Sequence, residues 1–300
     1  MAVAASVRRP ERARVLPLAA ALVTVCLWAS AFVGIRSAGR DLSPGALSLG
    51  RLLVASAVLA VFAARRRERL PSRRNLGGIV VCGILWLGAY NVLLNSAERK
   101  VDAGTAAMLV NLGPILIALL AGLLLREGFP RRLLGGCVIA FAGAAVIGLA
   151  TSERGISAGW GAALCVAAAF AYAGGVVAQK PLLREVSALQ VTWLACTIAT
   201  IACLPFAPSL VDEVGHARAS AIGWTIYLGA APTAIGFVTW AYALARTTAG
   251  RMGSTTYLVP PIAILLGWLI LGETPPALAF GGGALCLAGV AVARSRARGR

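Results

Sequence analysis

The chain has 300 residues, of which 59% are hydrophobic and only 13% are charged, and its mean hydropathy is +0.83. A soluble domain has about twice that charged fraction, so the composition excludes an ordinary soluble protein. The net charge of +17 would suit a partner such as nucleic acid, but the distribution of the basic residues, described below, argues against it.

Ten long windows, almost free of charge, follow one another along the chain. Each is 20 to 27 residues long, and Arg51 alone interrupts one of them. A helix needs about 20 apolar residues to cross a bilayer, and only helices and closed barrels satisfy all backbone polar groups in lipid. We therefore predict an all-α, polytopic membrane protein with ten transmembrane helices. The windows are 15–35, 42–64, 75–97, 103–125, 133–152, 155–179, 186–211, 219–245, 252–272 and 274–293.

The basic residues indicate the orientation in the membrane. If the N-terminus is inside, 21 of the 28 Lys and Arg residues lie in inside segments, 6 lie outside and Arg51 lies within a span. The positive-inside rule then predicts a multi-pass protein of the cell (plasma or inner) membrane with both termini cytoplasmic. The basic charge is explained by topology and by contact with anionic lipid of the bilayer, and no nucleic acid is expected as a partner.

The N-terminal segment also resembles a cleavable signal peptide, with basic residues, an apolar run and Ala29-Ser30-Ala31. We expect no cleavage, because it would remove one span and place the next loop on the wrong side. The predicted organisation is a basic cytoplasmic tail (1–14), a first repeat of five spans (15–150), a second repeat of five spans (155–294) and a basic cytoplasmic tail (295–300).

An internal repeat supports this division. Residues 97–146 recur without a gap at 243–292, a shift of 146, and 17 of the 50 positions are identical. The first two spans of each half align loosely at a slightly smaller shift, which places Trp28 on Tyr172 and Ser43 on Ser187. Because each half has five spans, the second is predicted to enter the membrane upside down. Inverted repeats are typical of secondary transporters and place the substrate site between the halves.

The order of these motifs resembles the EamA-type transporters of the drug/metabolite transporter superfamily, over nearly the whole chain. The resemblance implies a ten-helix transporter with two repeats that exports amino acids or related small metabolites. Direction and cargo are implied by the resemblance alone. The matching residues are Leu27-Trp28-Ala29-Ser30-Ala31-Phe32, Pro44, Arg51, Ala103-Gly104-Thr105-Ala106, Pro114, Glu127, Gly135-Gly136, Gly143, Pro260, Glu273, Gly281-Gly282 and Gly289.

Matching prolines indicate the substrate site. A proline inside a helix removes the hydrogen bond to the carbonyl four residues earlier. Pro114 frees the carbonyl of Val110, and Pro260 frees that of Thr256. Interrupted helices at corresponding positions in two halves are the best sequence indication of a transporter site. The candidates for the substrate cavity in these two spans are Asn111, Pro114, Thr255, Tyr257 and Pro260.

Further candidates lie in four other spans: Trp28, Ser30, Tyr90, Asn91, Tyr172 and Trp240. Asn91 is deep in its window, where an amide must be paired or line a wet cavity. Asn95, nearer the outer end, suits an interfacial position. Trp240 suits an aromatic belt as well as a cavity.

Arg51 is the one charge that interrupts a span. Placing Arg near a helix centre costs about 2.5–3.5 kcal/mol. Its side chain could snorkel to the outer surface, pair with helix carbonyls, or face the cavity as an anion contact for a substrate carboxylate. Its position favours snorkelling or structural pairing over direct binding.

The remaining features predict no chemistry. The seven cysteines lie in apolar windows, form no CxxC pair and suit packing. The only histidine, His216, lies in a loop, and no acid lies in mid-membrane, so no metal site, cofactor or enzyme activity is expected. Glu127 and Glu273 suit contacts to helix ends or arginines. The glycines of the fifth and tenth spans suit packing within each half or in a homodimer.

Three rival functions remain beside the transporter of a small-molecule substrate. An intramembrane enzyme lacks a nucleophile with a base. A flippase for a lipid or lipid-linked intermediate could use the same fold, with Arg51 binding headgroups. A passive channel is the weakest alternative.

Overall fold

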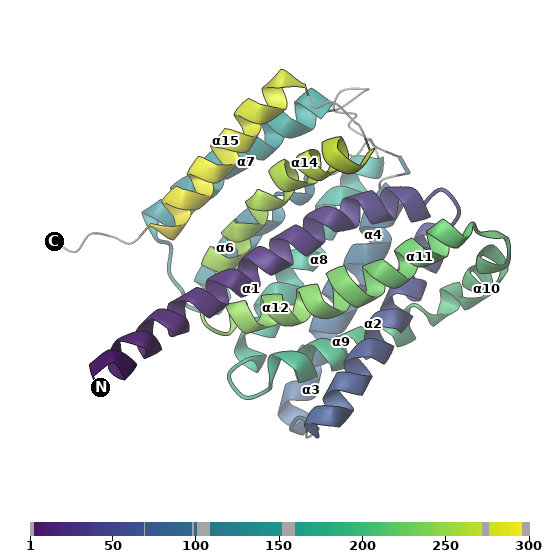
Figure 1. The fold of residues 1–300 in the computed structure, drawn as a ribbon, viewed down its shortest axis with the longest axis horizontal. Coiled ribbons are helices and arrows are strands. Elements are labelled where there is room, and N and C mark those ends of the chain that lie inside the picture. The colour runs from purple at the N-terminus through teal and green to yellow at the C-terminus, as the bar shows by residue number, and fades with distance from the viewer. Residues whose placement is uncertain are drawn as a thin grey trace.

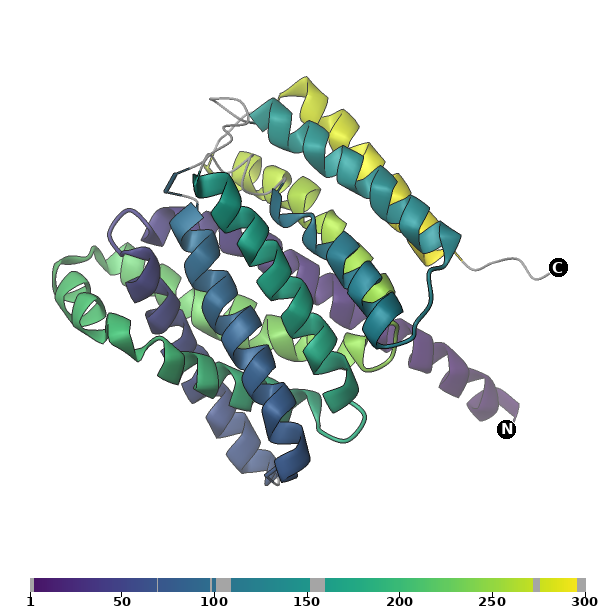
Figure 2. The same cartoon turned by 180° about the vertical axis from the view of Figure 1, so that it is seen from behind.

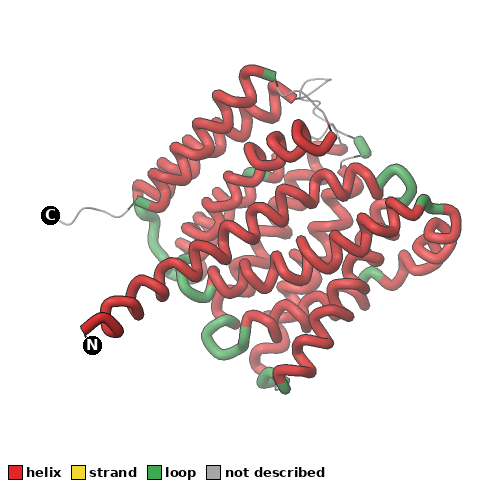
Figure 3. Tube along the Cα trace, viewed as in Figure 1, coloured by secondary structure: helices red, strands yellow, loops and turns green. Residues whose placement is uncertain are grey.

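The computed structural model describes residues 3–68, 70–97, 99–100, 109–151, 160–271 and 276–295. Every regular element in these ranges is helical (Figure 3). Six of the helices are long and apolar enough to cross a membrane, or seven if one bent pair counts as a single span. The all-α fold class is confirmed, and the chain has the helices of a multi-pass membrane protein. The count of ten spans stays a prediction.

In the first half, the helices that start at Pro44, Arg73 and Arg131 begin within two residues of the predicted windows 42–64, 75–97 and 133–152, whereas the first helix begins earlier, at Val3. The side chain of Ser43 caps the second helix by accepting the N–H of Ala46, and Pro44 follows in the first turn. The elements of this half are α1 (Val3–Ala38), α2 (Pro44–Arg66), α3 (Arg73–Cys82), η1 (Gly83–Ala89), α4 (Tyr90–Ala97), α6 (Gly113–Leu124) and α7 (Arg131–Thr151).

The second half repeats this pattern. Ser187 caps α9 by accepting the N–H of Gln190, as its counterpart Ser43 caps α2. The elements of this half are α8 (Trp160–Leu182), α9 (Ala188–Ala202), η2 (Leu204–Phe206), α10 (Ala207–His216), α11 (Ala219–Leu228), η3 (Gly229–Ile235), α12 (Gly236–Leu244), α13 (Ala249–Thr255), η4 (Thr256–Leu258), α14 (Val259–Leu271) and α15 (Ala277–Arg294).

Two π-helical segments occupy equivalent positions in the repeats. A shift of 146 moves the bounds of η1 onto those of η3. Pro232 lies inside η3, and the hydroxyl of Thr233 donates to the carbonyl of Leu228 at 2.7 Å, which satisfies one carbonyl of this wider turn. Short π-helical turns are rare and often lie at functional sites.

The predicted proline breaks are confirmed in both halves. Helix α6 begins at Gly113, directly before Pro114, and the 3-10 turn η4 separates α13 from α14 before Pro260. One further break differs from the uninterrupted window 186–211: the helix bends by 52° between α9 and α10. Pro205 lies at this bend, where a missing N–H ends the α-helical ladder.

Helices α7 and α15 lie side by side as a layer at one edge of the molecule (Figures 1 and 2). Gly136 faces the carbonyl of Gly289, and Gly143 faces that of Gly282; a β-carbon added to either Gly136 or Gly143 would lie 2.6 Å from the facing carbonyl oxygen. The helices are therefore antiparallel, and a shift of 146 exchanges the two pairs. The expectation that these glycines pack within each half is wrong, because close backbone contact here joins the two halves.

A polar clamp holds the turn between α12 and α13. The carboxylate of Glu127 accepts the N–H groups of Ala249 at 2.9 Å and Gly250 at 3.3 Å, at the start of α13. The ammonium of Lys180 donates to the carbonyls of Leu244 and Thr247 at 2.6 and 2.5 Å. An acid at a helix start and a base at a helix end both complement the helix dipole. For Glu127, the predicted contact with a helix end is confirmed.

Glu127→Ala is expected to lower the free energy of unfolding by about 1 kcal/mol, because two N–H groups at a helix start lose their acceptor. The matched control is Glu185→Ala, which removes an exposed contact to Asn75 and should change stability by less than about 0.5 kcal/mol. Thermal unfolding in detergent measures both. Equal midpoints for the two variants would contradict the role of Glu127 as a cap.

Candidate functional site

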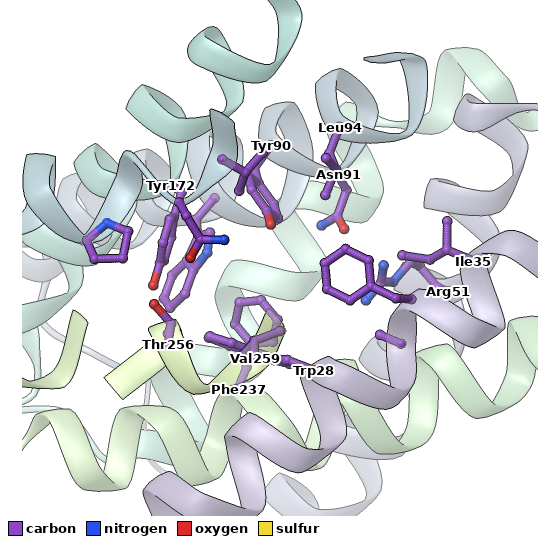
Figure 4. A pocket seen from close by; sticks show the side chains of 16 residues that line it. Trp28, Ile35, Arg51, Tyr90, Asn91, Leu94, Tyr172, Phe237, Thr256 and Val259 are labelled. Atoms are coloured by element: carbon purple, nitrogen blue, oxygen red, sulfur yellow. The ribbon is translucent and has the colours of Figure 1, made fainter. Parts of the chain in front are cut away.

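A cavity of about 100 Å³ lies between helices of both halves (Figure 4). Its aromatic lining residues are Trp28, Phe32, Trp86, Tyr90, Tyr172 and Phe237, and its polar ones are Arg51, Asn91, Asn111 and Thr256. The apolar remainder includes Ile35 and Leu94, so the cavity extends toward the end of the bundle where α1 and α4 finish. We call this the Ile35 end. The first and second halves therefore contribute to one site.

An aromatic layer closes the other side of the cavity. Trp28 stacks on Trp240 with ring centroids 4.9 Å apart and contacts Phe237 at 5.3 Å. Trp86 contacts Phe237 at 4.7 Å and Tyr172 at 5.5 Å. Trp240 has no exposed surface and lies behind the lining residues. These five side chains, named the aromatic layer here, come from α1, η1, α8 and α12.

Arg51 lies in the wall of this cavity, and snorkelling to the outer surface is contradicted by its exposed fraction of 5%. Its Nε and Nη2 donate to the hydroxyl oxygen of Thr233 at 3.1 and 2.9 Å. Because Thr233 belongs to η3, this contact joins the two halves. The reason for the difference is packing: the backbone carbonyl of Arg51 faces Gly229 of η3, so α2 presents this residue to the second half.

The structure brings seven of the sequence candidates to the cavity: Trp28, Arg51, Tyr90, Asn91, Asn111, Pro114 and Tyr172. The amide of Asn91 donates to the carbonyl of Leu87 at 2.7 Å, which provides the pairing expected of a deep amide. Asn111 and Pro114 lie at the break before α6. In Figure 4, Tyr172 and Thr256 lie on one side of the cavity and Arg51 lies on the opposite side.

Five candidates lie away from the cavity lining. Ser30 bonds to Tyr227, with its hydroxyl oxygen 2.6 Å from that of Tyr227. Thr255 accepts a bond from Arg294 at 2.9 Å. Tyr257 is fully buried among residues of α7 and α15, Pro260 lies in α14 behind the break, and Trp240 is in the aromatic layer. Periodicity could not separate these faces, because both faces of each span are apolar.

The other lining residues were not among the sequence candidates: Ala31, Phe32, Ile35, Trp86, Leu94, Val110, Phe237, Thr256 and Val259. The repeat contains a signal for Phe237, because the shift of 146 moves the candidate Asn91 onto it. Asn95 differs from the interfacial position expected: it is 5% exposed, and its amide donates to Ser48 at 3.0 Å and to the carbonyl of Pro44 at 3.3 Å. It therefore ties α4 to α2.

The chemistry of the cavity suits binding of a small solute. Arg51 is the charged residue among its lining residues, and every acidic residue of the chain lies outside the ten apolar windows or in their terminal residues. A guanidinium in a water-poor site attracts a carboxylate, since charged hydrogen bonds strengthen at low dielectric. The aromatic layer offers flat apolar surface to the rest of the solute.

Comparison with known proteins places these features in a family. The sequence profile of the EamA-like transporter family matches residues 16–149 and again residues 159–295. A Streptantibioticus cattleyicolor protein named "Probable terminal-alkyne amino-acid exporter" is 41% identical over 94% of both chains. The Bacillus subtilis "Uncharacterized transporter YdfC" is 33% identical, covering 88% of this chain and 86% of its own.

Two more distant proteins are also similar. The Salmonella typhimurium protein named "Probable amino-acid metabolite efflux pump" is 26% identical, over 90% of this chain and 92% of its own. A solved crystal structure with 22% identity superimposes with a TM-score of 0.75, over 93% of this chain and 96% of the other, which indicates a shared fold.

Proposed function

Because this chain belongs to the EamA-like transporter family, it is a membrane transporter and not an enzyme, and we propose that it exports amino acids or related small metabolites by alternating access. In this proposal ten spans form two inverted repeats, residues 15–150 and 155–294, in the cell membrane with both termini cytoplasmic. The Ile35 end then faces outside, because α1 starts inside. A homodimer is not needed for the site.

Three structural correspondences support the inverted repeat. The capped starts of α2 and α9 and the π-helical segments η1 and η3 lie at matching positions. The packing pairs Gly136–Gly289 and Gly143–Gly282 exchange under the repeat shift, as a two-fold relation between the halves requires. An antiparallel pair of equivalent helices is what two repeats of opposite orientation would produce.

The observation that carries the proposed function is a cavity built by both halves, with one buried arginine across from aromatic side chains. Arg51 would bind the substrate carboxylate, and Trp28 and Phe237 would contact its apolar part. Asn91 and Asn111 offer amide oxygens to an ammonium group. The names of the relatives from Streptantibioticus cattleyicolor and Salmonella typhimurium agree with an amino-acid cargo.

A flux measurement in proteoliposomes tests the proposal. Purified protein is reconstituted, and uptake of L-propargylglycine, a small terminal-alkyne amino acid, is followed with and without a pH gradient. Saturable uptake supports the proposed function, and the gradient shows whether protons are coupled. Absence of uptake of this and other amino acids, together with scrambling of fluorescent phospholipid, would instead support the flippase.

Trp28→Ala is expected to reduce this uptake on the order of tenfold to a hundredfold, because one side chain contacts the cavity, Trp240 and Phe237 and donates to the carbonyl of Pro232 at 3.2 Å. The matched control is Trp160→Ala, whose side chain is 69% exposed. Uptake at equal amounts of folded protein, checked by size-exclusion chromatography, is the measurement. Equal uptake by both variants would exclude this cavity as the site.

A further inference from the structure

The aromatic layer contains a closed contact between α12 and the first half. Phe237 and Trp240 from α12 both pack on Trp28, and Trp86 contacts the ring of Trp240 at 5.4 Å. With Trp240 fully buried, the cavity ends at this layer. The polar clamp of Glu127 and Lys180 holds the turn that follows α12. This end of the site is therefore closed twice, by the aromatic contact beside the cavity and by the polar clamp beyond it.

The repeat shift moves this closed contact onto the wall of the cavity. The shift of 146 moves Phe237 onto Asn91 and Trp240 onto Leu94, and the smaller shift of 144 moves Trp28 onto Tyr172. Asn91, Leu94 and Tyr172 all line the cavity. At one end, therefore, Phe237 and Trp240 pack on Trp28, and Trp240 is buried behind the cavity lining. At the other end all three equivalent positions line the cavity.

Phe237 and Trp240 lie in the first turns of α12, and Asn91 and Leu94 lie in the first turns of α4. These two helices are equivalent in the repeat, and each directly follows a π-helical segment. Helix α4 starts at Tyr90 after η1, and α12 starts at Gly236 after η3. Each π-helical segment also packs closely on the opposite half: a β-carbon added to Gly83 would lie 2.7 Å from the carbonyl oxygen of Ala195, and one added to Gly229 would lie 2.6 Å from that of Arg51. These close backbone contacts suit pivots.

We propose that Phe237 and Trp240 are the inner gate of the transporter, and that Asn91 and Leu94 are its outer gate, which closes on Tyr172 when the inner gate leaves Trp28. This inference rests on the alternating access proposed above. Helices α12 and α4 move about η3 and η1. The inner gate consists of large aromatic rings and the outer gate of smaller side chains, so the resting protein has its inner gate closed and its cavity facing outside.

The test transfers the inner gate to the outer position. Asn91→Phe combined with Leu94→Trp gives α4 the two aromatic side chains of α12, which should pack on Tyr172. Accessibility is read with Ala31→Cys, a cavity-lining position, by a membrane-impermeant thiol reagent added to one side of oriented vesicles. The parent protein without Ala31→Cys corrects for the seven native cysteines, of which Cys26 is exposed.

The expected result is reciprocal: labelling from outside falls on the order of tenfold, and labelling from inside rises by a similar factor, since adding aromatic pairs to one gate shifts the population of both states. Ile35→Trp is the control for bulk, because it fills the cavity wall without altering a gate. It should lower outside labelling without raising inside labelling. Trp240→Leu, which gives the inner gate its counterpart residue, should also raise inside labelling and lower outside labelling, because it weakens the contact that holds the inner gate closed.

The assignment of the gates would be overturned if cysteine labelling from outside fell without a rise in labelling from inside, in both the double variant and Trp240→Leu. Trp240→Leu keeps the inference testable if the double variant does not fold. Labelling requires no substrate, so the two proposals fail separately. Reciprocal labelling without amino-acid uptake would overturn the export function, whereas uptake with unchanged labelling would overturn only the gates.

Discussion

Arg51→Leu is expected to reduce transport of L-propargylglycine by about two orders of magnitude while leaving the protein folded. Removing one member of a buried, hydrogen-bonded charge pair typically costs about 2–5 kcal/mol in binding, and the proposed carboxylate would lose its cation. The substitution also removes a charge whose insertion into the membrane costs about 2.5–3.5 kcal/mol. Thermal stability should therefore stay the same or rise as transport falls.

Competition by an uncharged analogue separates carboxylate binding from a structural role. The carboxamide of L-propargylglycine should compete weakly with the parent compound in the wild-type protein. It should compete about as well as the parent compound in the Arg51→Leu variant. Thr233→Val is the matched control, because it removes the acceptor of Nε and Nη2 but keeps the charge, and should reduce transport far less. Unchanged discrimination in Arg51→Leu would exclude Arg51 as the carboxylate contact.

Gly136→Ala is expected to lower the free energy of unfolding by about 1–3 kcal/mol, as overpacking typically does. An added β-carbon would meet the backbone nitrogen of Ala293 and would lie 2.6 Å from the carbonyl oxygen of Gly289. Backbone atoms cannot rotate away as a side chain can, so α7 and α15 would have to separate. Transport should fall with stability, since this contact joins the two halves.

The neighbouring residue supplies the control. Gly135→Ala adds the same methyl group where nothing lies within 4 Å, so it should leave stability unchanged or raise it by up to about 1 kcal/mol through better helix propensity. The repeat predicts the same contrast between Gly282 and Gly281. Unfolding midpoints in detergent measure all four variants. Equal midpoints for Gly136→Ala and Gly135→Ala would contradict the close contact of α7 with α15.

Much of the fold could be predicted because its causes are local. Apolar windows of the length of a bilayer produce helices wherever they lie, since lipid leaves no other partner for the backbone. Ser43 and Ser187 start helices by accepting N–H groups three residues ahead, and Pro114 and Pro260 interrupt helices by lacking an N–H of their own. The EamA membership expected from the order of these motifs is confirmed by the family match.

The site was predicted less completely, because burial in a membrane protein does not follow the apolar pattern. Both faces of a span are apolar, and one of them contacts lipid while the other packs inside. The sequence therefore could not distinguish Tyr257, which packs toward α7 and α15, from Thr256 beside it, which lines the cavity. It also placed Asn95 at the interface, although its amide is buried against α2.

By itself the sequence determined the apolar helices, the repeat and the breaks in two of its helices, since each depends on neighbouring residues or on a direct comparison of the halves. Only the tertiary structure decided that Arg51 faces the cavity, that Trp28 meets Phe237 and Trp240, and that the glycines of α7 pack on those of α15. Those contacts join residues from different halves of the chain, and their geometry depends on how whole helices cross.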